Sequence, residues 1–178
     1  MDRALPGTRI TMKRPHLEGL PVVPLPSGFS LRYYRPGDIT AWLHIHQAAG
    51  ETHPVTPELY WREFAAGETQ LRQRQLFLCE ALGPEVGTAT AWFDDHHQGG
   101  SWGRLHWVAL SQTHQGRGLG RALAAAACLR LRELGHSRAY LRTHPDRVPA
   151  IRLYLSLGFV PDIVGPADRC AWEELRLA

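Results

Sequence analysis

The feature that most constrains the fold of this chain is a glycine-rich turn, Gln-Gly-Arg-Gly-Leu-Gly, at residues 115–120. An apolar segment from Leu105 to Leu110 precedes it, and an alanine-rich segment with apolar residues at helical spacing follows it. This order predicts a strand, a tight turn and the start of a helix. The first N–H groups of a helix have no intrahelical acceptor and lie at the positive end of its dipole. The turn therefore indicates an anion-binding site.

The residue types in this turn suit a diphosphate. Gly116, Gly118 and Gly120 allow sharp bends and let the backbone approach a phosphate without an intervening Cβ atom. Arg117 and Arg121 add fixed positive charge beside the same bend. Taken alone, such a turn is also compatible with an ordinary connection between a strand and a helix.

Two other phosphate-binding motifs do not match the spacing. A Walker loop has Lys-Ser/Thr after its last glycine, but Gly120 is followed by Arg121 and an alanine. A dinucleotide-binding turn has a small residue where Arg121 stands and an acidic residue at the end of the next strand. The next predicted strand, Arg138 to Arg142, ends without an acidic residue.

The turn resembles the acyl-CoA signature of the GNAT superfamily of N-acyltransferases, Gln/Arg-x-x-Gly-x-Gly/Ala, with Gln115, Gly118 and Gly120 at the specified positions. A later segment resembles a second signature of the family, Ala-Ile-x-Leu-Tyr-x-x-x-Gly-Phe-x-Pro. Its matching residues are Ala150, Ile151, Leu153, Tyr154, Leu157, Gly158, Phe159, Val160 and Pro161. Without the resemblance, this segment would be read as a short buried helix that ends at Gly158. Two signatures in the family's order make the resemblance specific.

The resemblance implies an α/β (α+β) fold, a GNAT-like single domain with a mixed, mostly antiparallel central sheet flanked by helices. With 178 residues, 44% of them hydrophobic, the chain is long enough for one such core. Residues 1–27 contain several prolines and are expected to form a loosely ordered leader, with the GNAT domain at residues 28–178. The pattern predicts strands at Phe29 to Tyr34, Leu76 to Ala81, Val86 to Phe93, Arg104 to Leu110, Arg138 to Arg142 and Cys170 to Leu177.

Several classes of function lack support in the composition. No apolar run approaches the roughly 20 residues of a membrane span. The arginines are spread along the chain and the formal net charge is only +3, so nucleic-acid binding is not expected. Three cysteines without C-x-x-C spacing favour reduced thiols and a cytoplasmic location. The run Asp94 to His97 is not expected to bind a metal, because adjacent strand residues point apart.

The resemblance implies acetyl-CoA as the cosubstrate. The pantetheine arm would lie along Val108, Ala109 and Leu110, and pair with their backbone as an added strand would. The diphosphate would bind the glycine turn, formed by Gln115, Gly116, Arg117, Gly118, Leu119, Gly120 and Arg121.

The implied reaction moves an acetyl group directly to a primary amine of a small molecule or peptide, without a covalent enzyme intermediate. Tyr154 matches the family tyrosine and is expected to protonate the leaving thiolate. Deprotonating an ammonium group of pKa about 10.4 costs roughly 4 to 5 kcal/mol at pH 7. His106, expected on one strand face with Val108 and Leu110, is the candidate base. A core histidine or a relay through water stays an open alternative.

Two arginines, Arg104 and Arg142, stand where relatives often carry a glutamate. They would favour an acceptor that bears a carboxylate or phosphate over a polycationic one, unless both pair with acidic loop residues. The missing glutamates also leave open a second function, a non-catalytic acyl-CoA-binding sensor or scaffold. The sequence does not decide whether the chain forms a homodimer.

Overall fold

The computed structural model describes residues 9–51 and 53–175. Within these ranges, seven strands form one sheet in the order β2-β3-β4-β5-β6-β1-β7. The strands are β1 (Ile10–Arg14), β2 (Phe29–Tyr33), β3 (Gln75–Glu80), β4 (Glu85–Asp94), β5 (Trp102–Leu110), β6 (Ala139–Thr143) and β7 (Val160–Pro161).

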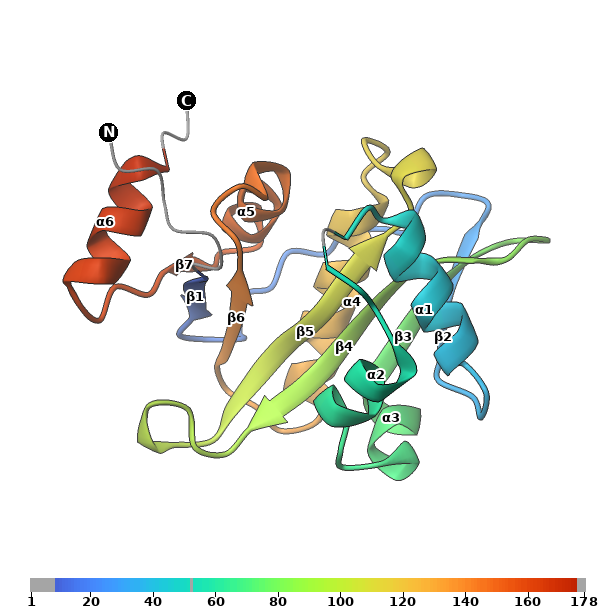
Figure 1. Ribbon diagram of the computed structural model, residues 1–178, viewed down its shortest axis with the longest axis horizontal. Helices are drawn as coiled ribbons and strands as arrows, with labels where there is room; N and C mark the ends of the chain where they lie inside the picture. Colours follow the sequence, from blue (N-terminus) through green and yellow to red (C-terminus); the bar gives the residue numbers. More distant parts are fainter. Residues whose placement is uncertain (1–8, 52, 176–178) are drawn as a thin grey trace.

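Helices cover both faces of the sheet (Figure 1). The short helices between residues 39 and 74 lie on one face, and the long helix at residues 119–133 crosses the other. The α-helices are α1 (Ile39–Ala48), α2 (Pro57–Glu63), α3 (Glu68–Arg74), α4 (Leu119–Glu133), α5 (Val148–Ser156) and α6 (Pro166–Glu174), with 3₁₀ turns η1 (His97–Gly99) and η2 (Gln112–His114). None of the helices in the described part of the chain has the length and apolar character needed to cross a bilayer.

The two faces of the sheet have cores of different composition. The face under α4 is aliphatic, with Leu123 and Leu131 of that helix fully buried. The face under α1, α2 and α3 is aromatic, centred on Trp42, Tyr60 and Phe64, whose rings pack edge to face or tilted at 4.8 to 6.0 Å. Such contacts add to the hydrophobic burial of each ring. Both layers are needed to bury the strands β3 and β4, which have few exposed positions.

Neighbouring strands are antiparallel except for β5 and β6, which are parallel. This mixed, mostly antiparallel sheet confirms the fold class predicted from the sequence. The pairing of β5 with β6 is limited to Gly103 opposite Ala139 and Arg104 opposite Tyr140. Beyond these residues the two strands diverge (Figure 1). The divergence opens the middle of the sheet and determines where a ligand can enter.

The expectation of a loosely ordered leader is wrong for residues 10–14. These residues form β1, which pairs with β6 from Ile10 opposite Thr143 to Arg14 opposite Ala139. Ile10 and Met12 are fully buried, so alternate side chains of β1 contribute to the core. The sheet therefore includes part of the segment assigned to the leader, whereas residues 1–8 lie outside the described residues.

The expected last strand at Cys170 to Leu177 is also wrong where the structure describes it. The helix α6 occupies Pro166–Glu174, with proline in its first turn. The Asp168 carboxylate accepts hydrogen bonds from the backbone N–H groups of Val164 and Gly165, at 3.0 and 2.9 Å. A proline in the first turn and an acidic residue bonded to the free N–H groups both favour a helix start.

Candidate active site

A cavity of about 90 Å³, called here the central cavity, lies where β5 and β6 diverge. Residues from seven parts of the fold line it: Arg9, Glu51, His53, Glu63, Arg104, Leu105, His106, Trp107, Val108, Arg142, Thr143, His144, Arg147 and Tyr154. The predicted acid, the predicted base and both predicted substrate arginines are therefore brought together. A separate, more open hollow beside α6 contains one ionisable residue, Arg169, and offers no such set.

A β-bulge in β5 shapes one wall of this cavity. His106 lies opposite Thr90 and Ala109 opposite Thr88, so Trp107 and Val108 together face a single residue of β4. Trp107 has a φ of +48°, an uncommon conformation for a bulky residue. Such irregularities are frequent beside functional sites, where they turn side chains to new directions.

The bulge changes which side chains share a face of β5. The sequence alternation placed His106 with Val108 and Leu110, and this expectation is wrong. His106 instead packs on the aromatic face, 5.6 Å from the Phe64 ring, whereas Val108 and Leu110 pack against the aliphatic core. One extra residue in a strand inverts the alternation after it. Arg104 and His106 precede the bulge and keep a common face.

Glu63, at the end of α2, reaches His106 from the helical layer. Its Oε2 atom lies 3.2 Å from Nε2 of His106 and accepts a hydrogen bond of 3.1 Å from Nε1 of Trp107. Sequence reasoning missed this residue, because nothing local to α2 indicates that its last residue faces β5. A carboxylate beside a histidine is a common arrangement for orienting the imidazole ring.

Burial and this contact set the protonation states of the pair. The contact with His106 lowers the pKa of Glu63 to about 2, so Glu63 is a carboxylate at neutral pH. Burial lowers the pKa of His106 to about 4, although the neighbouring carboxylate opposes the change. His106 is therefore neutral at pH 7 and able to accept a proton, but it is a weak base.

Tyr154, on α5, closes the opposite side of the cavity. Its side chain is 8% exposed and packs against Phe159, with ring centroids 6.2 Å apart. Burial raises the pKa of Tyr154 to about 12, so the hydroxyl stays protonated at neutral pH. A buried, protonated hydroxyl at the cavity wall is suited to donate a proton to a leaving group.

A second acidic residue, Glu51, lies in the loop between α1 and α2. Its Oε1 atom is 3.3 Å from Nδ1 of the buried His46 and 3.6 Å from Nη1 of Arg147. These contacts tie the loop to the start of α5 at the edge of the cavity. Arg147 therefore has a carboxylate of the same chain as its partner.

The glycine turn has the predicted geometry at the start of α4. Gly116 and Gly118 have φ values of +73° and +77°, conformations that L side chains rarely adopt, and both are exposed. Gly120 has a different function, because a Cβ atom there would lie 3.2 Å from Cδ1 of Leu153. It allows α4 and α5 to pack closely. The first N–H groups of α4 have no intrahelical acceptor and face outward from the turn.

Other residues predicted to bind the cosubstrate differ in what they offer a ligand. The side-chain amide of Gln115 donates a 3.0 Å hydrogen bond to the backbone O of Leu110, which closes the turn onto β5. Leu119 and Ala109 have buried side chains, so only their backbone groups are available to a ligand. The guanidinium of Arg117 lies 5.1 Å from the centre of the Phe29 ring, and Arg121 is exposed on the first turn of α4.

The histidine and aspartate residues at the end of β4 have structural contacts. The hydroxyl of Tyr140 donates a 2.6 Å hydrogen bond to Asp94, and the His97 ring stacks on the Tyr140 ring at 3.7 Å. The described residues contain no group of three or more histidine, cysteine or acidic side chains that could hold a metal ion.

Comparison with known proteins assigns the family. The model of the acetyltransferase (GNAT) family matches residues 39–159, which include β5, the glycine turn, α4 and α5. The chain belongs to the GNAT acetyltransferase family. This membership confirms the resemblance carried by the two signatures.

Two curated relatives are mycothiol acetyltransferases. The protein from Sanguibacter keddieii is 35% identical over 149 residues, covering 80% of this chain and 47% of the relative. The protein from Pseudarthrobacter chlorophenolicus is 36% identical over 146 residues, covering 79% of this chain and 45% of the relative. The chain spans about half the length of these relatives.

Solved structures support the fold. A GCN5-related N-acetyltransferase from Sphaerobacter thermophilus superposes with a TM-score of 0.70 at 23% identity, covering 86% of this chain and 48% of that one. The ribosomal-protein-S18-alanine N-acetyltransferase from Escherichia coli gives a TM-score of 0.61 at 24% identity, covering 76% of this chain and 79% of that one. The NatC complex, solved with a Gag peptide and CoA, gives a TM-score of 0.63 at 16% identity. The match covers 74% of this chain and 84% of that one.

Proposed function

We propose that this GNAT chain transfers an acetyl group from acetyl-CoA directly to a primary amine of a small molecule. One observation carries the proposal more than any other. The central cavity contains a buried tyrosine and a buried neutral histidine, and it opens at the gap between β5 and β6. The glycine turn follows the end of β5, so an extended ligand can follow one strand from the turn to the cavity.

The backbone of β5 supports binding of the pantetheine arm. Beyond Arg104 the side of β5 that faces β6 has no paired strand among the described residues. Val108 and Leu110 lie on this unpaired length, and their neighbouring backbone groups are available for strand-like hydrogen bonds. The diphosphate would then reach the N–H groups from Gly116 to Arg121, where the helix dipole and two arginines favour an anion.

The reaction requires two proton transfers and no covalent enzyme intermediate. The amine nitrogen attacks the thioester carbonyl carbon, forming a C–N bond, and the C–S bond then breaks. The proton lost by the amine passes to His106, directly or through water, with Glu63 stabilising the positive charge. The proton gained by the CoA sulfur comes from the Tyr154 hydroxyl. Before the next cycle Tyr154 regains a proton from solvent and His106 releases to solvent the proton that it accepted.

The relatives favour turnover over passive binding, because two of them are named as acetyltransferases of a small molecule. A cytoplasmic location and a homodimer stay predictions. The decisive experiment measures release of free CoA from acetyl-CoA with a panel of amines, amino acids and short peptides. Turnover with at least one amine, abolished without it, supports the enzyme. CoA binding without turnover across the panel would instead support the non-catalytic acyl-CoA-binding domain.

A further inference from the structure

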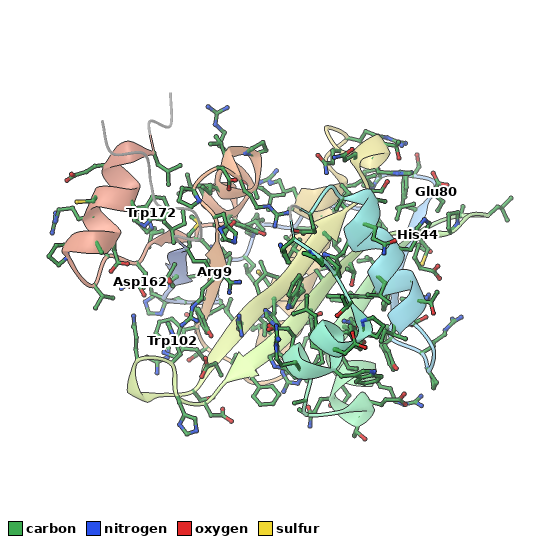
Figure 2. The ribbon with its side chains drawn as sticks, in the orientation of Figure 1. Arg9, His44, Glu80, Trp102, Asp162 and Trp172 are labelled. Atoms are coloured by element: carbon green, nitrogen blue, oxygen red, sulfur yellow. The ribbon has the colours of Figure 1, made fainter. Side chains whose placement is uncertain are left out.

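Three arginines line the central cavity: Arg104 of β5, Arg142 of β6, and Arg9, which immediately precedes β1. Thr11 of β1 lies opposite Arg142 of β6, which places Arg9 on the same face of the sheet as Arg142. Arg104 of β5 lies opposite Tyr140, two residues from Arg142 on the same face of β6. Figure 2 shows Arg9 beside β6, where this strand borders the cavity.

The Tyr140 ring contacts two of these guanidinium groups. Arg104 and Arg142 each lie 5.8 Å from the ring centre. The Tyr140 hydroxyl is bonded to Asp94, so the ring is fixed beneath both arginines. Cation–π contacts of this kind orient a guanidinium without neutralising its charge.

The three arginines have no carboxylate partner among the described residues. None of them lies within ion-pair distance of an acidic side chain, in contrast to Arg147, which pairs with Glu51. Arg104 is half-buried, and its Nε atom is fully buried without a hydrogen-bond partner. Burial lowers the pKa of Arg104, as expected for a cation removed from water without full compensation. This arrangement disagrees with the alternative in which Arg104 and Arg142 pair with acidic loop residues.

The acidic residues of the cavity are occupied elsewhere. Glu63 contacts His106 and Trp107, and Glu51 contacts His46 and Arg147. Arg104 is also distant from the expected position of the CoA diphosphate. Arg104 and Leu110 are six residues apart, and an extended strand of this length spans roughly 20 Å. The diphosphate cradle begins beyond Leu110, so its anion does not account for Arg104.

From this geometry we infer that the acceptor carries an anionic group, a carboxylate or a phosphate, which binds between Arg9, Arg104 and Arg142 while its amine faces the thioester. The inference rests on the proposed function and specifies its substrate class. Guanidinium groups suit both anions because their N–H donors match two oxygens at once. The same positive charges disfavour a protonated amine nearby, and so favour the neutral nucleophile. This effect compensates for the weak basicity of His106.

The first test compares acceptors that differ in charge but have similar amines. 4-Aminobutyrate is compared with its amide, and phosphoethanolamine with ethanolamine, by measuring kcat/KM for acetyl transfer. We expect the anionic member of at least one pair to be preferred by tenfold or more, and the two pairs distinguish carboxylate from phosphate recognition. A wild-type preference for the neutral members or for spermidine would overturn the inference.

The second test removes single charges at the two exposed arginines of these three. In Arg9→Gln and Arg142→Gln, kcat/KM for the preferred anionic acceptor is expected to fall at least tenfold, whereas kcat/KM for its neutral partner changes less than threefold. Arg72→Gln, an exposed arginine on α3, is the matched control and should change neither value. Equal losses for charged and neutral acceptors would contradict an anion site.

A third measurement does not depend on turnover, so it separates this inference from the proposed function. Butyrate, butyramide and inorganic phosphate are titrated into the CoA-saturated protein by calorimetry. An anion that binds wild type and binds at least tenfold more weakly to Arg9→Gln supports the site, even if no acetylation is found. Absence of binding by both anions would reject it, even if neutral amines are acetylated.

Discussion

The Oε2 atom of Glu63, on helix α2, lies 3.2 Å from Nε2 of His106 on strand β5. Relatives often place a glutamate on one of the two central strands, but Arg104 and Arg142 occupy these positions here. The structure instead brings a carboxylate to the cavity from the helical layer. A negative charge therefore borders the candidate base, although the strands themselves contribute positive charge.

This pair predicts a specific pH dependence. Because the pKa of His106 is lowered to about 4, His106 is already deprotonated above pH 6. The rise of kcat/KM between pH 6 and 9 is then due to ionisation of the acceptor amine. His106→Ala should lower kcat/KM by roughly 10-fold to 100-fold and leave the shape of the profile in this range unchanged. Initial rates across that range measure it, and a rising limb that disappears in His106→Ala would contradict the assignment.

Glu63 should support this base through its charge. Glu63→Gln keeps the size of the side chain and its contact with Trp107 but removes the negative charge beside His106. We expect kcat to fall by roughly tenfold with KM for acetyl-CoA within twofold, because the imidazolium formed during turnover loses its partner. Glu58→Gln, at the other end of α2, is the control. An unchanged kcat in Glu63→Gln would leave the contact with a structural function only.

Acid should destabilise the fold through the same two residues. The folded-state pKa of His106 is about 4 against 6.5 for an ordinary histidine, and that of Glu63 is about 2 against 4.5. In both cases the unfolded chain binds a proton at a pH where the folded chain does not, so stability falls as pH decreases. The window extends from about pH 6.5 to 4 for His106 and from 4.5 to 2 for Glu63.

Urea unfolding at pH 7, 5.5 and 4 measures this loss. His106→Gln should remove the His106 contribution, up to about 3 kcal/mol between pH 7 and 4. The buried His46, whose pKa burial also lowers, retains its part of the dependence. His16→Gln, at an exposed position, is the control. The prediction fails if wild type and His106→Gln lose stability equally on acidification.

Tyr154→Phe tests the proton donor. The change retains the ring that packs on Phe159 and removes only the hydroxyl, so kcat should fall by roughly 100-fold with CoA affinity nearly unchanged. Tyr33→Phe, where the tyrosine is exposed, should behave as wild type. Steady-state rates and calorimetric titration of CoA give both quantities. Full activity in Tyr154→Phe would exclude this tyrosine as the acid.

Gly118→Val tests the diphosphate cradle. A Cβ atom at Gly118 would meet open space, so the expected cost comes from the backbone, whose φ of +77° is strained for valine. Relief of this strain would reorient the first N–H groups of α4. CoA affinity should therefore fall by about tenfold or more in calorimetric titration. Gly19→Val, at a φ of +62° with equally open surroundings, controls for strain remote from the cradle. Unchanged CoA affinity in a folded Gly118→Val variant would argue against the cradle.

Local patterns predicted the elements that depend mainly on neighbouring residues. Two apolar runs on either side of Gly83 predicted the β3–β4 hairpin. Apolar residues at helical spacing after the glycine turn predicted α4. The strand β1 was missed because prolines around it suggested a leader, although Ile10 and Met12 alternate with polar residues. The alternating segment of β1 is short, and the strand is stabilised by pairing with β6, which is more than a hundred residues away in sequence.

The sequence by itself determined the family signatures, the glycine turn before a helix, and the placement of Tyr154 on a short helix after β6. These features depend on residue type and short spacing. Only the tertiary structure decided that Trp107 forms a bulge, that Glu63 reaches His106, and that Arg9 joins the other two arginines. The physical reason is that each of these contacts joins segments distant in sequence, and their geometry is set by how the strands diverge and the helices pack.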